Sequence, residues 1–254
     1  MMNRRNLLLG AAALSLSGCK LLDGASKNGS TLQALFASTE GLTMRAQRLL
    51  AGDALAPQFT EADIRQGQRP NGSTDPKGDA YLAVKAGGFQ DYRLQITGLV
   101  ETPLSLSYAE LRAMPSRTQI TRHDCVEGWS CIAKWTGVPL GLVLDQAHPK
   151  LAARYALFHC YDAIEKTLSG EVFYYETLDL IEAYHPQSIL AYAMNGAPLP
   201  VANGAPLRLR AERNLGYKMA KYIHTIELVD SFAMLAGGKG SYWADRGYSW
   251  YAGI

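Results

Sequence analysis

Apolar residues recur along the chain with two different periods, and these periods predict a mixture of strands and short helices. Between Tyr92 and Glu101 the residues alternate, with Leu94 and Ile96 on one face, which is typical of a half-buried strand. Apolar runs at Tyr155–Tyr161 and Ile189–Met194 indicate two more strands. Further strands are expected from the patterns at 207–210 and 222–229.

Helices are predicted where capping residues or a 3.6-residue period appear. Ser107 and Glu110 form a capping box, so 108–114 is expected to be a short helix that stops before Pro115. Pro139 opens a second helix that runs to about Ala147. A weaker helical stripe covers 30–50. Because strands and helices alternate without a regular βαβ period, the fold class is α+β, with mixed sheets and short helices.

The amino terminus has the features of a processing signal. Arg4 and Arg5 precede an apolar run from Leu7 to Leu16, which is shorter than the about 20 residues that cross a bilayer. Leu-Ser-Gly-Cys at 16–19 resembles a bacterial lipobox, and the paired arginines resemble a twin-arginine export signal. We therefore expect a signal peptide with lipobox over 1–19, a tether and helix over 20–60, and a folded domain over 61–254. The expected location is the periplasm or cell envelope, with a lipid anchor as the only membrane attachment.

Composition and charge fit a soluble globular protein and give no reason to expect a nucleic-acid partner. The chain has 254 residues, 48% hydrophobic residues and a formal net charge of +2. Cations concentrate between positions 208 and 221, where Glu212 is the single acidic residue. This stretch suits a small anionic ligand. The cations are Arg208, Arg210, Arg213, Lys218 and Lys221.

A repeated Asn-Gly-Ala-Pro-Leu sequence at 195–199 and 203–207 precedes these cations. Asn-Gly turns permit positive φ and can direct backbone N–H groups toward an anion. The alternation at 207–210 places Arg208 and Arg210 on one face. Two interpretations stay open: an amphipathic strand with a solvated arginine face, or a phosphate clamp that includes Arg208 and Lys221.

The remaining candidate for chemistry is Cys125, which follows Arg122 and His123 and precedes Glu127. Neighbouring cations favour the thiolate form. Zinc is disfavoured because Cys125 and Cys131 do not have a zinc-site spacing, and a cysteine peptidase would need an oriented histidine. A buried structural thiol stays open. So does a disulfide between Cys131 and Cys160.

Four segments in this order resemble the sulfite oxidase superfamily of molybdopterin enzymes, and its small exported bacterial members most closely. The segments are 93–100, Cys-Val-Glu-Gly-Trp at 125–129, Trp-Thr-Gly-Val-Pro-Leu at 135–140, and Asn-Gly-Ala-Pro-Leu-Arg at 203–208. The similarity extends from about Arg69 to about Asp230. It implies a sulfite-oxidase-type fold and a molybdenum–molybdopterin cofactor.

The resemblance also implies roles for individual residues. Cys125 would be the protein thiolate that binds molybdenum. Glu127 would be a carboxylate near the metal that relays protons. The expected cofactor contacts are Asn71, Cys160, Asn203, Arg208, Met219, Ala220 and Lys221, where Cys160 replaces a threonine of the reductase-like members.

The implied activity is oxygen-atom transfer on a small molecule, with sulfoxide reduction as the expected reaction. Sulfite oxidases carry an arginine just after the ligand cysteine, and Val126 to Ser130 contains none. The chain is expected to be a monomer that exchanges electrons with a separate carrier, such as a cytochrome or a membrane quinone-linked subunit. Sulfite oxidation stays open as an alternative, and so does a non-catalytic envelope lipoprotein that uses the same fold as a binding scaffold.

Overall fold

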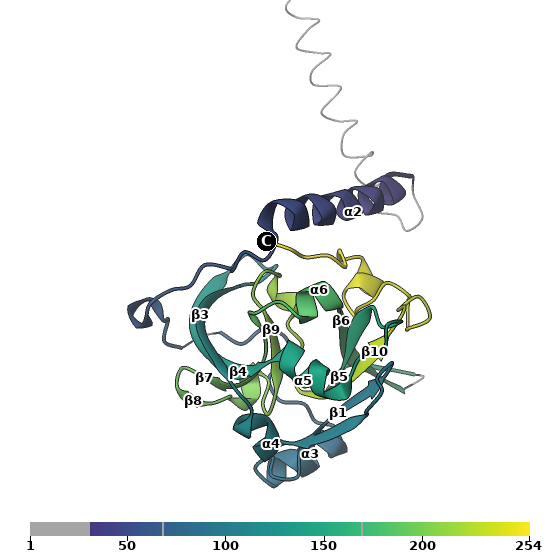
Figure 1. Cartoon of the computed structure of the whole chain (residues 1–254). Helices are drawn as coiled ribbons and strands as arrows, with labels where there is room; N and C mark the ends of the chain where they lie inside the picture. The colour runs from purple at the N-terminus through teal and green to yellow at the C-terminus, as the bar shows by residue number, and fades with distance from the viewer. Residues whose placement is uncertain (1–30, 68, 169) are drawn as a thin grey trace, which may run out of the picture. The chain divides into compact units, whose positions relative to one another are not determined.

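The computed structural model describes residues 31–67, 69–168 and 170–254 (Figure 1). The chain separates into two compact units, Met1–Gly52 and Asp53–Ile254. In the described part of the first unit, helix α2 (Thr31–Ala51) confirms the predicted helical stripe. The expected lipobox at Cys19 lies outside the described residues. No helix in the described ranges has the length and apolarity of a membrane span.

In the described residues of the second unit, the strands form two sheets, one mixed and one antiparallel. The first sheet has the order β2-β1-β10-β5-β6, in which β1 and β10 are parallel and the other neighbours antiparallel. Its strands are β1 (Arg93–Gly98), β2 (Leu104–Ser107), β5 (Tyr155–Thr167), β6 (Gly170–Asp179) and β10 (Ile223–Val229).

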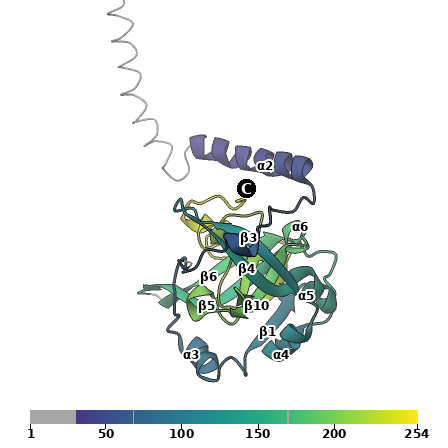
Figure 2. The same cartoon turned by 90° about the vertical axis from the view of Figure 1, so that its left-hand side faces the viewer.

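The second sheet has the order β3-β4-β7-β8, and β9 also pairs with β7. The two sheets lie on opposite sides of the domain in Figure 1, and the 90° view places the second sheet in front of the first (Figure 2). The strands of the second sheet are β3 (Arg117–Asp124), β4 (Ser130–Pro139), β7 (Ser188–Met194), β8 (Ala197–Pro198) and β9 (Arg208–Ala211).

Short helices connect and cover the sheets. Ser107 caps α4 by accepting from Glu110 N, and the Glu110 carboxylate accepts from Ser107 N, so the predicted capping box is confirmed. Pro139 is the residue before α5, also as predicted. The helices are α3 (Asp79–Ala86), α4 (Tyr108–Ala113), α5 (Leu140–Ala147) and α6 (Leu180–Ala183), with 3₁₀ turns η1 (Glu61–Asp63), η2 (Val201–Asn203), η3 (Gly216–Lys218) and η4 (Ala244–Arg246).

One hydrophobic core contains side chains from both sheets and from α5. Leu94 and Ile96 of β1 are fully buried in it, as the alternating pattern predicts, and Val143 of α5 is also buried there. A second cluster surrounds Trp135 of β4. The strand patterns at 155–161, 189–194, 207–210 and 222–229 correspond to β5, β7, β9 and β10. The observed fold is therefore the expected α+β arrangement of mixed sheets and short helices.

Gly137 permits the close approach of β4 to β7. The pairing of these strands shifts register between Thr136 and Gly137. A Cβ on Gly137 would lie 2.6 Å from Ala191 Cα and would also overlap the backbone of Leu190. Because these neighbours are backbone atoms of a buried strand, they cannot move aside as a flexible side chain would.

We therefore expect Gly137→Ala to lower the free energy of unfolding by about 1–3 kcal/mol, as overpacking of a core does. Denaturant unfolding measures this change. Gly87→Ala is the control, because a Cβ there would lie 3.5 Å from Asp91 Oδ2, an ordinary contact. Equal stability of the two variants would contradict this account of the β4–β7 contact.

Candidate functional site

Cys125 lies on the tight turn that joins β3 to β4. Its N–H donates to Trp129 O at 2.9 Å, its carbonyl accepts from Gly128 N at 3.0 Å, and Gly128 has φ +84°. Glycine adopts that backbone conformation without steric cost. The turn presents the half-buried sulfur near the backbone N–H groups of Val126 and Glu127.

The turn forms one wall of a cavity of roughly 140 Å³. Segments from four distant parts of the sequence supply the other walls. Five residues that the sequence singled out line this cavity together: Asn71, Cys125, Glu127, Met219 and Lys221. Further lining residues are Gly72, Ser73, Val126, Asp162, Ile164, Tyr174, Gly216, Tyr217, Trp243 and Tyr248.

The cations before Cys125 do not activate its thiol, so that part of the sequence interpretation is wrong. Arg122 is exposed and pairs with Asp124 at 2.8 Å. His123 is buried, and burial together with the nearby Arg210 lowers its pKa to about 2, so the imidazole is neutral. Burial raises the pKa of the Cys125 thiol, which outweighs the lowering by the backbone N–H of Glu127 and by Arg69. A metal that binds here would therefore have to displace the thiol proton.

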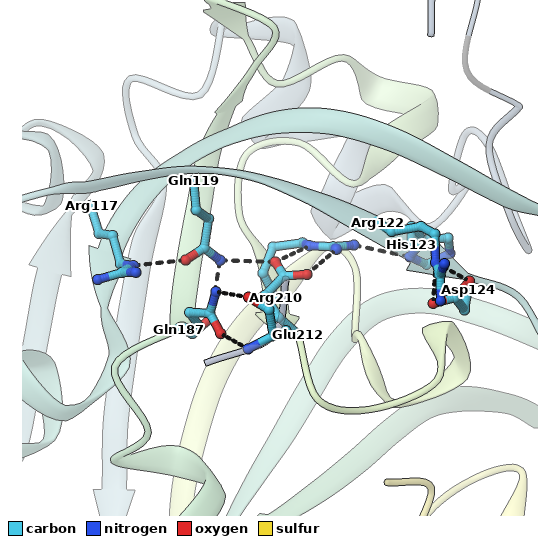
Figure 3. Close-up of polar contacts among 9 residues, drawn as sticks. Arg117, Gln119, Arg122, His123, Asp124, Gln187, Arg210 and Glu212 are labelled. Atoms are coloured by element: carbon cyan, nitrogen blue, oxygen red, sulfur yellow. Dashed lines mark hydrogen bonds and ion pairs between the residues drawn. The ribbon is translucent and has the colours of Figure 1, made fainter. Parts of the chain in front are cut away.

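A buried polar network fixes the strand that leads to Cys125 (Figure 3). Gln119 Nε2 donates to Glu212 Oε1 at 2.8 Å, and Arg210 binds both oxygens of Glu212 at 2.9 and 2.5 Å. Arg210 Nη1 lies 2.9 Å from His123 Nδ1. Because arginine can only donate, the His123 proton is on Nε2. The network ties β3 to β9 two residues before the cysteine.

Three of the five cations between positions 208 and 221 are neutralised by buried carboxylates. Arg210 pairs with Glu212, Arg213 pairs with Glu182 at 2.6 Å, and Lys218 pairs with Glu176. Glu176 and Glu182 lie on other elements, which is why the sequence stretch looked strongly basic. These pairs leave two cations for a different role.

Arg208 and Lys221 are the two cations of this stretch that form no ion pair with any described residue. Arg208 is 1% exposed; its Nη1 donates to Asn203 O at 2.9 Å, while its Nε and Nη2 lack hydrogen-bond partners. Lys221 Nζ donates to Asn71 O at 2.7 Å, to Ala202 O at 3.2 Å and to Ser73 O. Of the two interpretations left open by the sequence, the solvated arginine face is therefore wrong, because β9 is buried throughout.

Gly204 brings these two cations together. Its φ is +114°, and a Cβ there would lie 3.0 Å from Lys221 Cβ and 3.1 Å from Arg208 Cβ. Burial and the charge of Arg208 lower the pKa of Lys221 to about 7, and burial with the charge of Arg210 lowers the pKa of Arg208 to about 9. Burial of two cations that repel each other lowers the stability of the fold unless an anion binds to them.

Four of the residues expected to contact the cofactor are not in the cavity wall. Asn203 is nearly buried and contacts Arg208 through its carbonyl. Ala220 is buried in the core between Met219 and Lys221. Cys160 lines a separate cavity of roughly 370 Å³. Tyr174 is a wall residue of both cavities. Arg208 is buried next to Gly204. Cys160 and Cys131 are both free thiols, so they form no disulfide.

Glu127 lies at the mouth of the cavity. Its side chain is 63% exposed, accepts from Trp129 Nε1 at 3.0 Å and lies 4.0 Å from Arg69 Nη2. Arg69 also stacks against Trp129, at 5.8 Å from the ring centre. Glu127 therefore has access both to solvent and to the space above Cys125.

Sequence reasoning missed Ser73 and Asp162. Ser73 hydrogen-bonds to Asp162, which is 6% exposed. Burial raises the pKa of this carboxyl. An aspartate within the apolar run of β5 was the signal available in the sequence, because charged residues are rarely buried without a partner.

Comparison with known proteins places this site in a family. Residues 81–234 match the family described as the oxidoreductase molybdopterin binding domain. The chain belongs to this family. It is therefore a molybdopterin-dependent oxidoreductase, and the expected relation to the sulfite oxidase superfamily is confirmed.

Relatives within the molybdopterin-binding family support the same assignment. The chain is 34% identical over 250 residues to a putative protein-methionine-sulfoxide reductase subunit YedZ1 of Azospira oryzae, covering 98% of this chain and 86% of that protein. It is 38% identical over 161 residues to the protein-methionine-sulfoxide reductase catalytic subunit MsrP of Xanthomonas campestris, covering 61% of this chain and 50% of that one. The chain thus spans about half of the latter relative.

A solved structure of similar fold is the sulfane dehydrogenase SoxCD from Paracoccus pantotrophus. The TM-score is 0.53 at 22% identity, covering 70% of this chain and 46% of that chain. At this low sequence identity the similarity supports the fold alone. That fold is the expected sulfite-oxidase type.

The site fits a molybdopterin on the evidence of its own donors. Among the described residues, Nε and Nη2 of Arg208 have no acceptor, and Lys221 lies beside Arg208 with a lowered pKa. A phosphate supplies the acceptor oxygens that Arg208 lacks and a negative charge for both cations. Cys125 supplies one soft sulfur ligand for a metal. The described residues contain no cluster of three or more His, Cys, Asp or Glu side chains suited to a metal ion.

The cofactor-free chain should become more stable between about pH 7 and pH 9 because of Lys221. The unfolded lysine stays protonated up to about pH 10.4, whereas the folded one loses its proton at about pH 7. The unfolded state therefore binds more protons in this window, and the free energy of unfolding rises by up to about 1.4 kcal/mol per pH unit.

Denaturant unfolding of the cofactor-free chain at several pH values measures this slope. Lys221→Met should flatten the slope, and Lys150→Met, at an exposed position, should leave it intact. An identical slope in wild type and Lys221→Met would contradict the pKa that burial gives this lysine.

Proposed function

We propose that this chain holds a molybdenum–molybdopterin cofactor through Cys125 and removes the oxygen atom of a sulfoxide. The proposal rests on one observation: a half-buried cysteine lies in a cavity, and two buried cations nearby in the fold form no ion pair with any described residue. The relatives named as methionine-sulfoxide reductase subunits support the choice of substrate class. The cofactor supplies a metal centre that exchanges an oxygen atom and electrons with the substrate.

The residues of this chain divide the binding of that cofactor between two ends. Cys125 anchors the metal end on the β3–β4 turn. Arg208 and Lys221 neutralise the phosphate end, and Gly204 allows them to approach it. Asn71 and Met219 line the cavity and would contact the cofactor directly. Asn203 and Ala220 would support Arg208 and Lys221 from outside the cavity wall, and Cys160 lines the neighbouring cavity that shares Tyr174.

Sulfoxide reduction consumes two protons and two electrons and releases water. Glu127 at the cavity mouth is placed to pass protons from solvent. The electrons come from a separate carrier, such as a cytochrome or a membrane quinone-linked subunit. We further propose that the chain works as a monomer in the periplasm or cell envelope, exported by the twin-arginine route and anchored by a lipid on Cys19.

Sulfite oxidation is disfavoured by the charges around the cavity mouth. An oxyanion substrate needs a cation beside the metal, and the segment after Cys125 supplies none. Arg69 is the cation that contacts this segment, but its side chain is 73% exposed and lies against Glu127. A neutral sulfoxide does not require that cation.

The purified exported protein should contain about one molybdenum atom per chain, and Cys125→Ser should lose it, because a hydroxyl is a poor ligand for a soft metal site. Elemental analysis and pterin fluorescence measure metal and cofactor separately. Cys131→Ser is the matched control, since Cys131 lies on β4 outside the cavity. Full molybdenum content in Cys125→Ser would rule out Cys125 as the ligand. Absence of molybdenum from wild type matured with a cofactor supply would favour a binding scaffold.

The loaded protein should reduce methionine sulfoxide with an artificial electron donor and should not oxidise sulfite with an artificial acceptor. The expected difference follows because the segment from Val126 to Ser130 contains no arginine or lysine. Steady-state rates with both substrates, on one protein preparation, measure it. Efficient sulfite oxidation without sulfoxide reduction would overturn the proposed reaction.

A further inference from the structure

A break in the pairing of β5 directs Asp162 into the cavity that contains Cys125. The register of β5 with β6 is regular up to His159 and shifts twice beyond it, between His159 and Ala163 and between Ala163 and Glu165, and the pairing of β5 with β10 shifts between Ile223 and Thr225. Such irregularities are typical next to active sites, because they redirect one side chain. As a result Asp162 is nearly buried and lines the same cavity as Cys125.

A hydrogen bond and a nearby cation fix the position of the Asp162 carboxyl, but they do not offset the effect of burial on its pKa. Ser73 Oγ donates to Asp162 Oδ2, and the Lys221 ammonium acts on the same carboxyl from the segment before β10. Burial raises the pKa of Asp162 more than Ser73 and Lys221 lower it. The other titratable groups that face it are Cys160 on its own strand, Tyr81 on α3, Tyr222 before β10 and Tyr242 in the carboxy-terminal segment.

We propose that Asp162 is the buried acid of this cavity, which donates a proton to the oxygen atom that leaves the sulfoxide. The inference rests on the proposed function. In the overall step the S–O bond breaks and two O–H bonds form, one with the proton of Asp162 and one with a proton from solvent. Two electrons from the external carrier reduce the sulfur, and water leaves. Solvent protons then restore the Asp162 carboxyl.

The position of Asp162 distinguishes its task from that of Glu127. Glu127 is exposed at the cavity mouth and contacts Trp129, so it exchanges with bulk water. Asp162 is enclosed and keeps its proton to a higher pH than an exposed aspartate does. A carboxyl of that kind stores a proton inside the cavity, where water has limited access.

Asp162→Asn tests the inference, because asparagine keeps the shape and still accepts from Ser73 but cannot donate an acidic proton. Molybdenum and pterin contents should equal those of wild type, while kcat for sulfoxide reduction should fall about 100-fold, the usual contribution of a general acid. The decline of wild-type kcat as pH rises through the pKa of Asp162 should disappear in the variant. Asp75→Asn is the control, since Asp75 pairs with Lys77 and Lys85 outside the cavity.

A second measurement uses the cofactor-free chain and needs no substrate. Because the folded pKa of Asp162 is raised, the folded state binds more protons than the unfolded state above about pH 4, and stability falls as pH rises through that window. Asp162→Asn removes this loss, so its melting temperature relative to wild type should increase from pH 4 to pH 8. A constant difference would show that the buried carboxyl does not store a proton.

The possible outcomes separate the two proposals. An active wild type with an unchanged kcat and pH profile in Asp162→Asn overturns the role of Asp162 alone. Loss of molybdenum or pterin from the variant also overturns it, since Asp162 would then hold the cofactor. A molybdenum-loaded wild type that reduces no sulfoxide contradicts the proposed function, and the acid role fails with it.

Discussion

The site depends on the burial of two neighbouring cations, Arg208 and Lys221, that form no ion pair with a carboxylate among the described residues. Burial of an unpaired charge costs several kcal/mol, and the two unpartnered N–H groups of Arg208 add to that cost. Proteins retain such an arrangement where a ligand supplies the missing charge. The neighbouring cations Arg210, Arg213 and Lys218 each have a buried carboxylate, which makes the exception informative.

The rest of the domain positions this cation pair relative to Cys125. Arg210 and Arg208 alternate on β9, and both stack on Trp135 of β4, at 4.4 and 5.0 Å from its ring centre. Arg210 reaches His123, which precedes Cys125 on β3 (Figure 3). The same strand therefore carries Arg208, one of the two cations proposed to bind phosphate, and through His123 supports the turn that presents Cys125. A rigid connection of this kind is what a two-ended cofactor requires.

The strand β1, which has an apolar period, could be predicted from the sequence, whereas β3, whose inward-facing residues are polar, could not. β1 shows its buried face through Leu94 and Ile96. β3 instead buries Gln119, Thr121 and His123, so its alternation is hidden from hydropathy, and no strand was expected over its full length. The capping box of Ser107 and Glu110 could be predicted because it depends on two residues only three positions apart. The neutrality of His123 was not, because it arises from contacts across the sheet.

The same distinction applies to the site. Cys125 and the Asn-Gly-Ala-Pro-Leu-Arg segment carry motifs, and these led to the family. The pairing of Ser73 with Asp162 joins positions 89 residues apart through an irregular strand, which no local pattern encodes.

The most direct test of the account is a crystal structure of the exported, cofactor-loaded protein with diffraction data at the molybdenum absorption edge. The account predicts one anomalous peak within bonding distance of Cys125 Sγ and a phosphate group that accepts from Arg208 Nε or Nη2. A molybdenum peak away from Cys125, or a phosphate that leaves Arg208 unpartnered, would contradict it.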